Sequence, residues 1–304
     1  MTQRNIFCRR SCLVALLVVM LSSLSPAHVR AQSSAPGLDI FSGLDFNFRD
    51  INYSRQYDLL IHLTPGFKWN MGNHWQLAGQ VYIPIVNTYG STYKYVYLNI
   101  LDVSKQLRLG PVYLKASAGL FSLQRYGVDL KAFLPITPWL ALEGQAGWVG
   151  VLTMSPSWYI SPLNRFAWNA GGDIYLSRWN AQLRAVAGRY VYQDFGCEVE
   201  AMRHFNHTSA SLYGRWSNVT GFDGGFRFVA MLPPYRRKHR AVNFRPASNF
   251  RISYSIMYHQ YTNRMYNTDP EENERDGWFS RDLLQWGSHT MQPDFIESSN
   301  TVTE

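Results

Sequence analysis

The sequence predicts an all-β protein, a transmembrane antiparallel β-barrel of the outer-membrane type with about 12–14 strands. The first observation is an alternation of apolar and polar side chains, as in 112–120, which recurs about a dozen times between Leu38 and Tyr258. The second is length, because many runs reach about 10–14 residues, whereas strands in ordinary sheets average roughly 5–6 and a tilted membrane strand needs about 9–11. The third is that longer connectors tend to alternate with tight turns.

The first 31 residues have the pattern of a secretion signal. Arg4, Arg9 and Arg10 give a basic start, and an apolar run follows from Leu13 to Leu24. The run is shorter than the about 20 residues of a spanning helix, so a signal is favoured over a membrane anchor. We expect cleavage after Ala31, a barrel domain over 32–304, and a polar tail or extension over 262–304.

The composition of the chain without the predicted signal limits the classes of protein that fit it. Four arginines leave with the signal, so Lys and Arg fall from 29 to 25 against 21 acids, and the net charge falls from +8 to +4. That mild charge gives no support for nucleic-acid binding. Cys197 is the one cysteine left, so the sheet, the core or a membrane must hold the chain without an internal disulfide. Glycine, tyrosine and tryptophan are plentiful, which suits strands and turns.

Thirteen strands are predicted, and single-chain bacterial barrels have even strand numbers. Either one prediction is spurious, or a fourteenth strand lies in the tail around Trp278 to Trp286. The irregular alternation of the strand predicted at 93–108 indicates a bulge near Leu101. The predicted strands span 38–48, 57–70, 76–86, 93–108, 112–122, 125–134, 138–151, 165–177, 180–192, 196–205, 208–216, 222–232 and 249–260.

The polar faces of these strands carry charged residues that a barrel would turn into its lumen. Alternatively, these charges lie on the solvent-exposed face of a soluble periplasmic β-sandwich. That alternative explains the many glycines on the same faces less well. Trp75, Trp139 and Trp179 fall at tight-turn ends, where an aromatic girdle lies in outer-membrane barrels. The predicted lumen-facing residues are Lys115, Asp129, Lys131, Glu143, Gln145, Arg184, Asp223, Arg227 and Arg251.

A basic stretch is the densest run of charge in the chain. Arginine pairs well with phosphates and carboxylates, so the stretch could contact lipopolysaccharide or an acidic polysaccharide. The alternative is a solvated connector with ordinary surface charge. The predicted anion-contact residues are Arg236, Arg237, Lys238, Arg240 and, beyond them, Arg245.

Two strands and the connector between them carry a resemblance. The string 223–228 (DGGFRF) is followed by prolines, the basic connector and the aromatic strand 250–255 (FRISYS). This arrangement, over about 212–261, resembles the carboxyl-terminal barrel of YjbH-type outer-membrane proteins, which are linked to export of exopolysaccharide or capsule. The resemblance implies a non-enzymatic protein of the Gram-negative outer membrane. Its partners would be outer-membrane lipid, polysaccharide and export-machinery proteins.

Other functions are weighed against this one. A general porin-like channel for small solutes is the main alternative. His207, Ser209 and Ser211 share one strand face, as a barrel lipid hydrolase or acyltransferase would need, but that face is predicted to point away from lipid. His204 and His207, three apart, face opposite ways on a strand, so joint metal binding would need a turn. We expect no catalytic residue, metal site or cofactor.

Overall fold

The computed structural model describes residues 37–50, 57–90, 94–137, 139–154, 157–205, 208–231, 241–247, 249–256 and 265–270. The chain divides into two compact units, Met1–Ala31 and Gln32–Glu304, and every described residue belongs to the second. The signal-peptide prediction therefore stays a prediction, and the suggested strand around Trp278 to Trp286 also lies outside the described residues.

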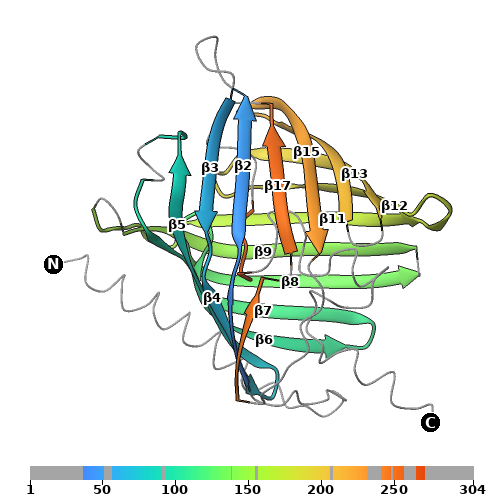
Figure 1. The fold of residues 1–304 in the computed structure, drawn as a ribbon. Coiled ribbons are helices and arrows are strands. Elements are labelled where there is room, and N and C mark those ends of the chain that lie inside the picture. The colour runs from blue at the N-terminus through green and yellow to red at the C-terminus, as the bar shows by residue number, and fades with distance from the viewer. Residues whose placement is uncertain are drawn as a thin grey trace. The chain divides into compact units, whose positions relative to one another are not determined.

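The described residues form a single β-sheet with one short 3-10 turn, η2 (Ser177–Trp179). Within the described ranges there is no helix long and apolar enough to cross a membrane. The strand segments (Figure 1) are β1 (Gly37–Ser42), β2 (Leu44–Asp50), β3 (Tyr57–Leu63), β4 (Gly66–Gly72), β5 (Trp75–Asn87), β6 (Tyr97–Leu109), β7 (Val112–Phe121), β8 (Arg125–Thr137), β9 (Leu140–Thr153), β10 (Tyr159–Ile160), β11 (Arg165–Leu176), β12 (Ala181–Arg189), β13 (Phe195–His204), β14 (Thr208–Ser217), β15 (Gly221–Met231), β16 (Val242–Pro246) and β17 (Asn249–Ser255).

The sheet closes into a barrel of thirteen strands. Three strands of the ring each consist of two segments, namely β1 with β2, β3 with β4, and β16 with β17. The two-residue segment β10 pairs with the end of β9 and is not counted as a strand of the ring. In the described ring each strand has a hydrogen-bonded neighbour on both sides, so closure leaves no edge strand. The predicted fold class is confirmed, and the range of 12–14 strands includes the observed number.

The ring is sealed by a parallel pair of strands. β17 runs alongside β2 with Ile252 opposite Phe46, and β16 runs alongside β1 with Val242 opposite Leu38. In a closed ring, all neighbouring strands can be antiparallel only if the number of strands is even. With thirteen strands that alternate in direction, the last strand runs parallel to the first. Thirteen strands suffice for closure, so none of the predicted strands is spurious, and the strand suggested around Trp278 to Trp286 stays a prediction.

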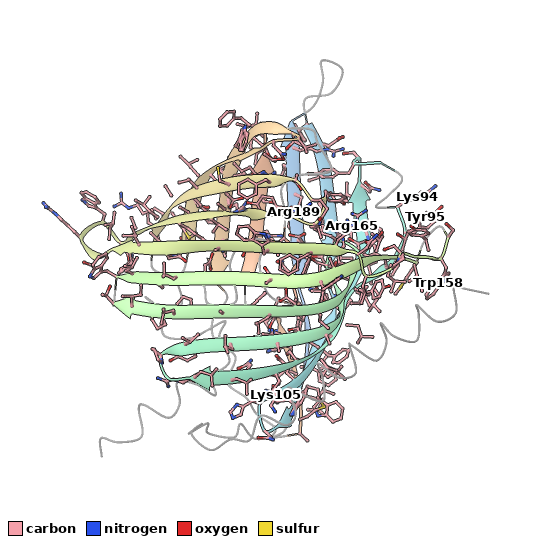
Figure 2. All side chains as sticks on the ribbon, turned by 180° about the vertical axis from the view of Figure 1, so that it is seen from behind. Lys94, Tyr95, Lys105, Trp158, Arg165 and Arg189 are labelled. Atoms are coloured by element: carbon pink, nitrogen blue, oxygen red, sulfur yellow. The ribbon has the colours of Figure 1, made fainter. Side chains whose placement is uncertain are left out.

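The two faces of the barrel have opposite polarity. Among the described residues, 32 polar or charged residues are buried against 16 hydrophobic ones. On β6, Leu101 and Val103 are exposed on the outside while Asp102 and Ser104 are buried inside. Figure 2 shows side chains along the whole outer surface of the strands. This polarity is the reverse of a soluble β-sandwich, which would seal leucines, valines and phenylalanines between its layers.

The two ends of the barrel differ. One end, the turn end, carries short turns such as that between β6 and β7, and the other, the loop end, carries the longer connections 88–96 and 154–164. The predicted alternation of connectors holds only in part, because the loop end also has three-residue connections at 122–124 and 218–220. Trp139 and Trp179 are 53% and 60% exposed at the turn end, where the aromatic girdle was expected.

The predicted irregularities are small in the structure. The register between β5 and β6 shifts between Gln80 and Val81, which leaves Asn99 as the extra residue, two positions before the bulge expected near Leu101. The register of β14 with β15 runs through Gly224 and Gly225 without a shift. A Cβ on Gly225 would lie 2.7 Å from the Tyr213 hydroxyl, so this glycine allows the tyrosine to approach closely.

The register of the parallel seam gives a first prediction. In a Cys197→Ser background, cysteines at Phe46 and Ile252 are directly opposite each other, so oxidation should link them, since paired strands hold Cα atoms within disulfide reach. Peptide mapping by mass spectrometry should find this bond. The control pair Phe48→Cys and Ile252→Cys is offset by two residues along the seam and should stay reduced. A disulfide in the control pair but not in the test pair would contradict the register.

Candidate functional site

The inner wall of the barrel is built from ion pairs between neighbouring strands. Arg49 on β2 lies opposite Asp58 on β3, with 3.0 Å between Nη2 and Oδ2. Across the parallel seam, Arg251 lies opposite Asp45 with 2.7 Å between Nη2 and Oδ1. Directly opposite residues on one face of a sheet are close enough to interact, and charge-assisted hydrogen bonds are the stronger kind. The pairs therefore satisfy charges that would be costly to bury alone.

The same arrangement continues over the wall formed by β13, β14 and β15. Arg215 faces Asp223, and its Nε donates a hydrogen bond of 2.6 Å to Asp223 Oδ2. Arg227 reaches from β15 past β14 to Glu200 on β13, with 3.1 Å between Nη1 and Oε1. Ser211 of β14 donates to the same Glu200 oxygen. Each of these groups is buried, so the wall here is a connected polar network.

A third group of charges joins β9, β11 and β12. Arg184 Nε donates a hydrogen bond of 2.7 Å to Glu143 Oε1, two strands away. Asp173 and Glu200 lie opposite Arg184 on the two flanking strands. Gln182 Nε2 donates to Asp173 Oδ1. One guanidinium is therefore surrounded by three carboxylates.

The wall formed by β7 and β8 is arranged differently. Lys115 on β7 lies directly opposite Lys131 on β8, and the next residue across on β6 is Gln106. Both lysines are buried, at 1% and 6% exposure. Like charges directly opposite one another destabilise a sheet, so a carboxylate close to these two lysines stabilises this region.

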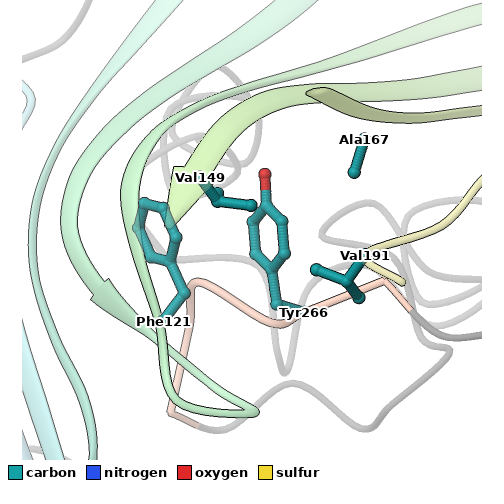
Figure 3. Close-up of a cluster of buried hydrophobic side chains, with 5 residues drawn as sticks. All are labelled: Phe121, Val149, Ala167, Val191 and Tyr266. Carbon is teal, nitrogen blue, oxygen red and sulfur yellow. The ribbon is translucent and has the colours of Figure 1, made fainter. Parts of the chain in front are cut away.

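Residues 265–270 lie inside the barrel against this wall. Tyr266 is 1% exposed and packs with Phe121, Val149 and Val191 (Figure 3), its ring stacked on Phe121 at 5.0 Å between centroids. Its hydroxyl donates a hydrogen bond of 2.7 Å to Asp129 Oδ1. Burial and the Asp129 carboxylate raise the pKa of the Tyr266 phenol, so that it stays protonated and keeps donating. An anchored aromatic ring thus lies inside the loop end of the barrel.

Backbone groups of the same segment bond to the wall at three further points. Asn267 N–H donates to the Ser122 hydroxyl (2.7 Å), and Ser122 N–H donates to the Asn267 carbonyl (3.0 Å). Gln145 Nε2 donates to the Tyr266 carbonyl at 3.3 Å, and Gln80 Nε2 donates to the Pro270 carbonyl at 2.7 Å. We call residues 265–270 the lumen segment.

Asp269 gives the lumen segment its ionic contact. Its Oδ1 lies 2.5 Å from Lys68 Nζ on β4, and its Oδ2 lies 3.5 Å from Lys115 Nζ on β7. All three side chains are at most 10% exposed. The carboxylate therefore bridges two lysines from well-separated strands of the wall.

Every predicted lumen residue lies on the inward side of its strand. Glu143, Gln145 and Arg184 are partly buried, and the other six predicted residues are buried below 9%. Asp223 forms an ion pair with Arg215, and Arg227 forms one with Glu200.

The other candidates separate into two groups. Arg236, Arg237, Lys238, Arg240 and His207 lie outside the described residues. Arg245 on β16 lies 4.0 Å from Asp39 Oδ2 and over the Phe41 ring at 5.0 Å, so it belongs to the inner wall and not to an anion-contact connector. His204 is buried with Nε2 3.3 Å from Gln182 Oε1. The described residues contain no cluster of His, Cys, Asp or Glu that could hold a metal.

Sequence reasoning missed the lumen segment and most of its receptors. Tyr266 and Asp269 were assigned to a polar tail or extension, because the tail has no period that would assign it to a face, and Lys68 was not singled out. Lys68 could have been found, since it falls within the predicted strand 57–70.

A glycine provides a test of this docking. A Cβ on Gly147 would lie 1.6 Å from the Tyr266 hydroxyl, so Gly147→Ala should weaken docking of the lumen segment by about 1–3 kcal/mol, the usual cost of overpacking. Amide exchange at Ser122 and Asn267 should then accelerate by about tenfold to a hundredfold.

Gly144→Ala is the matched control, because its Cβ would make an ordinary contact at 3.6 Å on the outer face of the same strand. Exchange in this variant should match wild type. Equal exchange in wild type and Gly147→Ala would show that Tyr266 does not dock as described.

Comparison with protein-family models and with curated proteins gives no match.

Proposed function

We propose that this chain is a non-enzymatic outer-membrane β-barrel that assists export or surface assembly of an exopolysaccharide or capsule. The observation that carries the proposal is the reversed polarity of the closed barrel, with an apolar outer surface and a charged, hydrogen-bonding inner wall. Outer-membrane barrels have this distribution because hydrocarbon solvates the outside. Strands β5 to β9, of 10–14 residues, are long enough to cross a bilayer when tilted.

The inner wall supports a polysaccharide role by its chemistry. Carboxylates, guanidinium groups and amides alternate around it, and these are the groups that exchange hydrogen bonds with sugar hydroxyls and carboxylates. The resemblance of 212–261 to YjbH-type proteins points to the same role. The partners proposed are outer-membrane lipid, the polysaccharide and proteins of its export machinery, without a cofactor.

A general porin for small solutes is the second candidate, which the continuous polar wall favours. The lumen segment disfavours it, because Tyr266 and Asp269 occupy space that a general porin would leave to water. Many small-solute channels are wide and water-filled.

A deletion strain tests the proposal. Loss of the gene should lower surface polysaccharide, measured as uronic acid and total sugar released from washed cells, and plasmid expression of the wild-type chain should restore it. Unchanged surface glycan in the deletion strain would refute the proposed role. Purified protein in a planar bilayer distinguishes the second candidate, because a general porin would give large, steady currents, whereas an occupied lumen should give small or rare ones.

A further inference from the structure

The lysines that receive Asp269 differ from the arginines of the same wall. Arg49, Arg215 and Arg251 each lie directly opposite a carboxylate on a neighbouring strand. Lys115 lies directly opposite Lys131. The wall therefore carries its own counter-charge at these arginines, whereas at Lys115 a bound carboxylate comes from the lumen segment.

The receptor has the geometry of a site for one carboxylate. Each oxygen of Asp269 faces a different ammonium group, Oδ1 that of Lys68 and Oδ2 that of Lys115. The Lys115 side chain is 1% exposed and the Lys68 side chain 10%, so both charges depend on close partners rather than on bulk water. A planar group with two oxygens satisfies both lysines at once.

A neutral donor lies next to the lysines. Gln80 Nε2 donates a hydrogen bond of 2.7 Å to the carbonyl of Pro270, which follows Asp269 in the chain. Asn99 Nδ2 donates to Gln80 Oε1 at 3.1 Å, which turns the Gln80 amide nitrogen toward the lumen. A ligand with a carboxylate and an adjacent hydroxyl or ring oxygen could take both contacts that the Asp269–Pro270 unit makes. A uronate, a sugar whose carboxylate adjoins a ring oxygen, has this arrangement.

We propose that Lys68, Lys115 and Gln80 form a binding site for a uronate unit of an acidic polysaccharide, and that Asp269 occupies this site when the lumen segment is docked. The inference rests on the proposed function, because it names the substrate class for the same lumen. Docking of Asp269 and binding of a uronate exclude one another, so the polymer must displace the segment to enter.

Competition by a tethered group reduces the apparent affinity of an external ligand. A segment in the same chain acts at an effective concentration of about millimolar or more, and a site that is free only part of the time binds more weakly by that fraction. Asp269→Asn keeps the shape of the side chain and removes its charge. This change should remove the Asp269 charge from the two lysines without adding a new contact for the ligand.

The experiment is a calorimetric titration of the purified full-length barrel in detergent with trigalacturonate, at constant ionic strength to hold screening fixed. Asp269→Asn should bind at least about tenfold more tightly than wild type. Adding Lys115→Gln to this variant should reverse the gain. Gly147→Ala, which displaces Tyr266 and leaves the lysines intact, should also tighten binding, so a second variant tests the idea if the first folds poorly.

Asp58→Asn is the matched control, since it removes a paired carboxylate from another part of the wall, and it should bind like wild type. A neutral galactose trimer should not bind tightly to any variant. Unchanged affinity in both Asp269→Asn and Gly147→Ala overturns the proposal, as does a double variant that binds as tightly as Asp269→Asn. Inorganic phosphate that binds as tightly as trigalacturonate overturns the assignment to a carboxylate.

The outcome is separable from that of the proposed function. Binding is measured on purified protein and does not depend on surface glycan, whereas the deletion strain reports on glycan alone. Tight binding with normal surface glycan would keep the site and refute the export role. Loss of glycan without a gain in affinity in either Asp269→Asn or Gly147→Ala would keep the role and refute the site.

Discussion

The structure depends on closure of the hydrogen-bonded ring. A strand with a free edge would expose unpaired N–H and C=O groups, which hydrocarbon cannot satisfy. With thirteen strands the last runs parallel to the first, and the seam between β17 and β2 is the consequence. The Arg251–Asp45 and Asn47–Ser253 contacts cross this seam, so side chains reinforce the parallel pairing on the inner face.

Closure also determines where charge can lie. Successive side chains of a strand face opposite ways, so each strand that presents apolar groups outward must present its alternate residues to the lumen. Buried charges are tolerated there because they are paired, as in Arg215 with Asp223 and Arg184 with Glu143. Where Lys115 faces Lys131, Asp269 brings a carboxylate to Lys115 from a segment outside the ring. The lumen segment thus adds a carboxylate to the charges of the inner wall.

Much of this barrel could be predicted from local pattern. The alternation around Lys115 and Arg184 gave the correct face for both residues, and the thirteen predicted strands correspond to the thirteen of the ring. The partners could not be predicted, because an alternation says which way Arg227 points but not that Glu200, 27 residues away, will meet it. The docking of Tyr266 and Asp269 was invisible for the same reason, since their receptors lie 137 and 154 residues away and the tail has no period. The rule of even strand number misled because it describes the usual barrel, whereas closure itself requires only that both edges be paired.

The central claim is that hydrocarbon solvates the outer face while water and polar groups fill the inner one. Single cysteines along β14 test it, at outward Ala210 and Leu212 and at inward Ser209 and Ser211, in a Cys197→Ser background reconstituted in lipid vesicles. Spin labels at these sites should alternate, with oxygen colliding more often at the outward pair and a water-soluble nickel chelate favouring the inward pair. Labels at 210 and 212 that the nickel chelate reaches freely, or four labels with no alternation, would contradict the account.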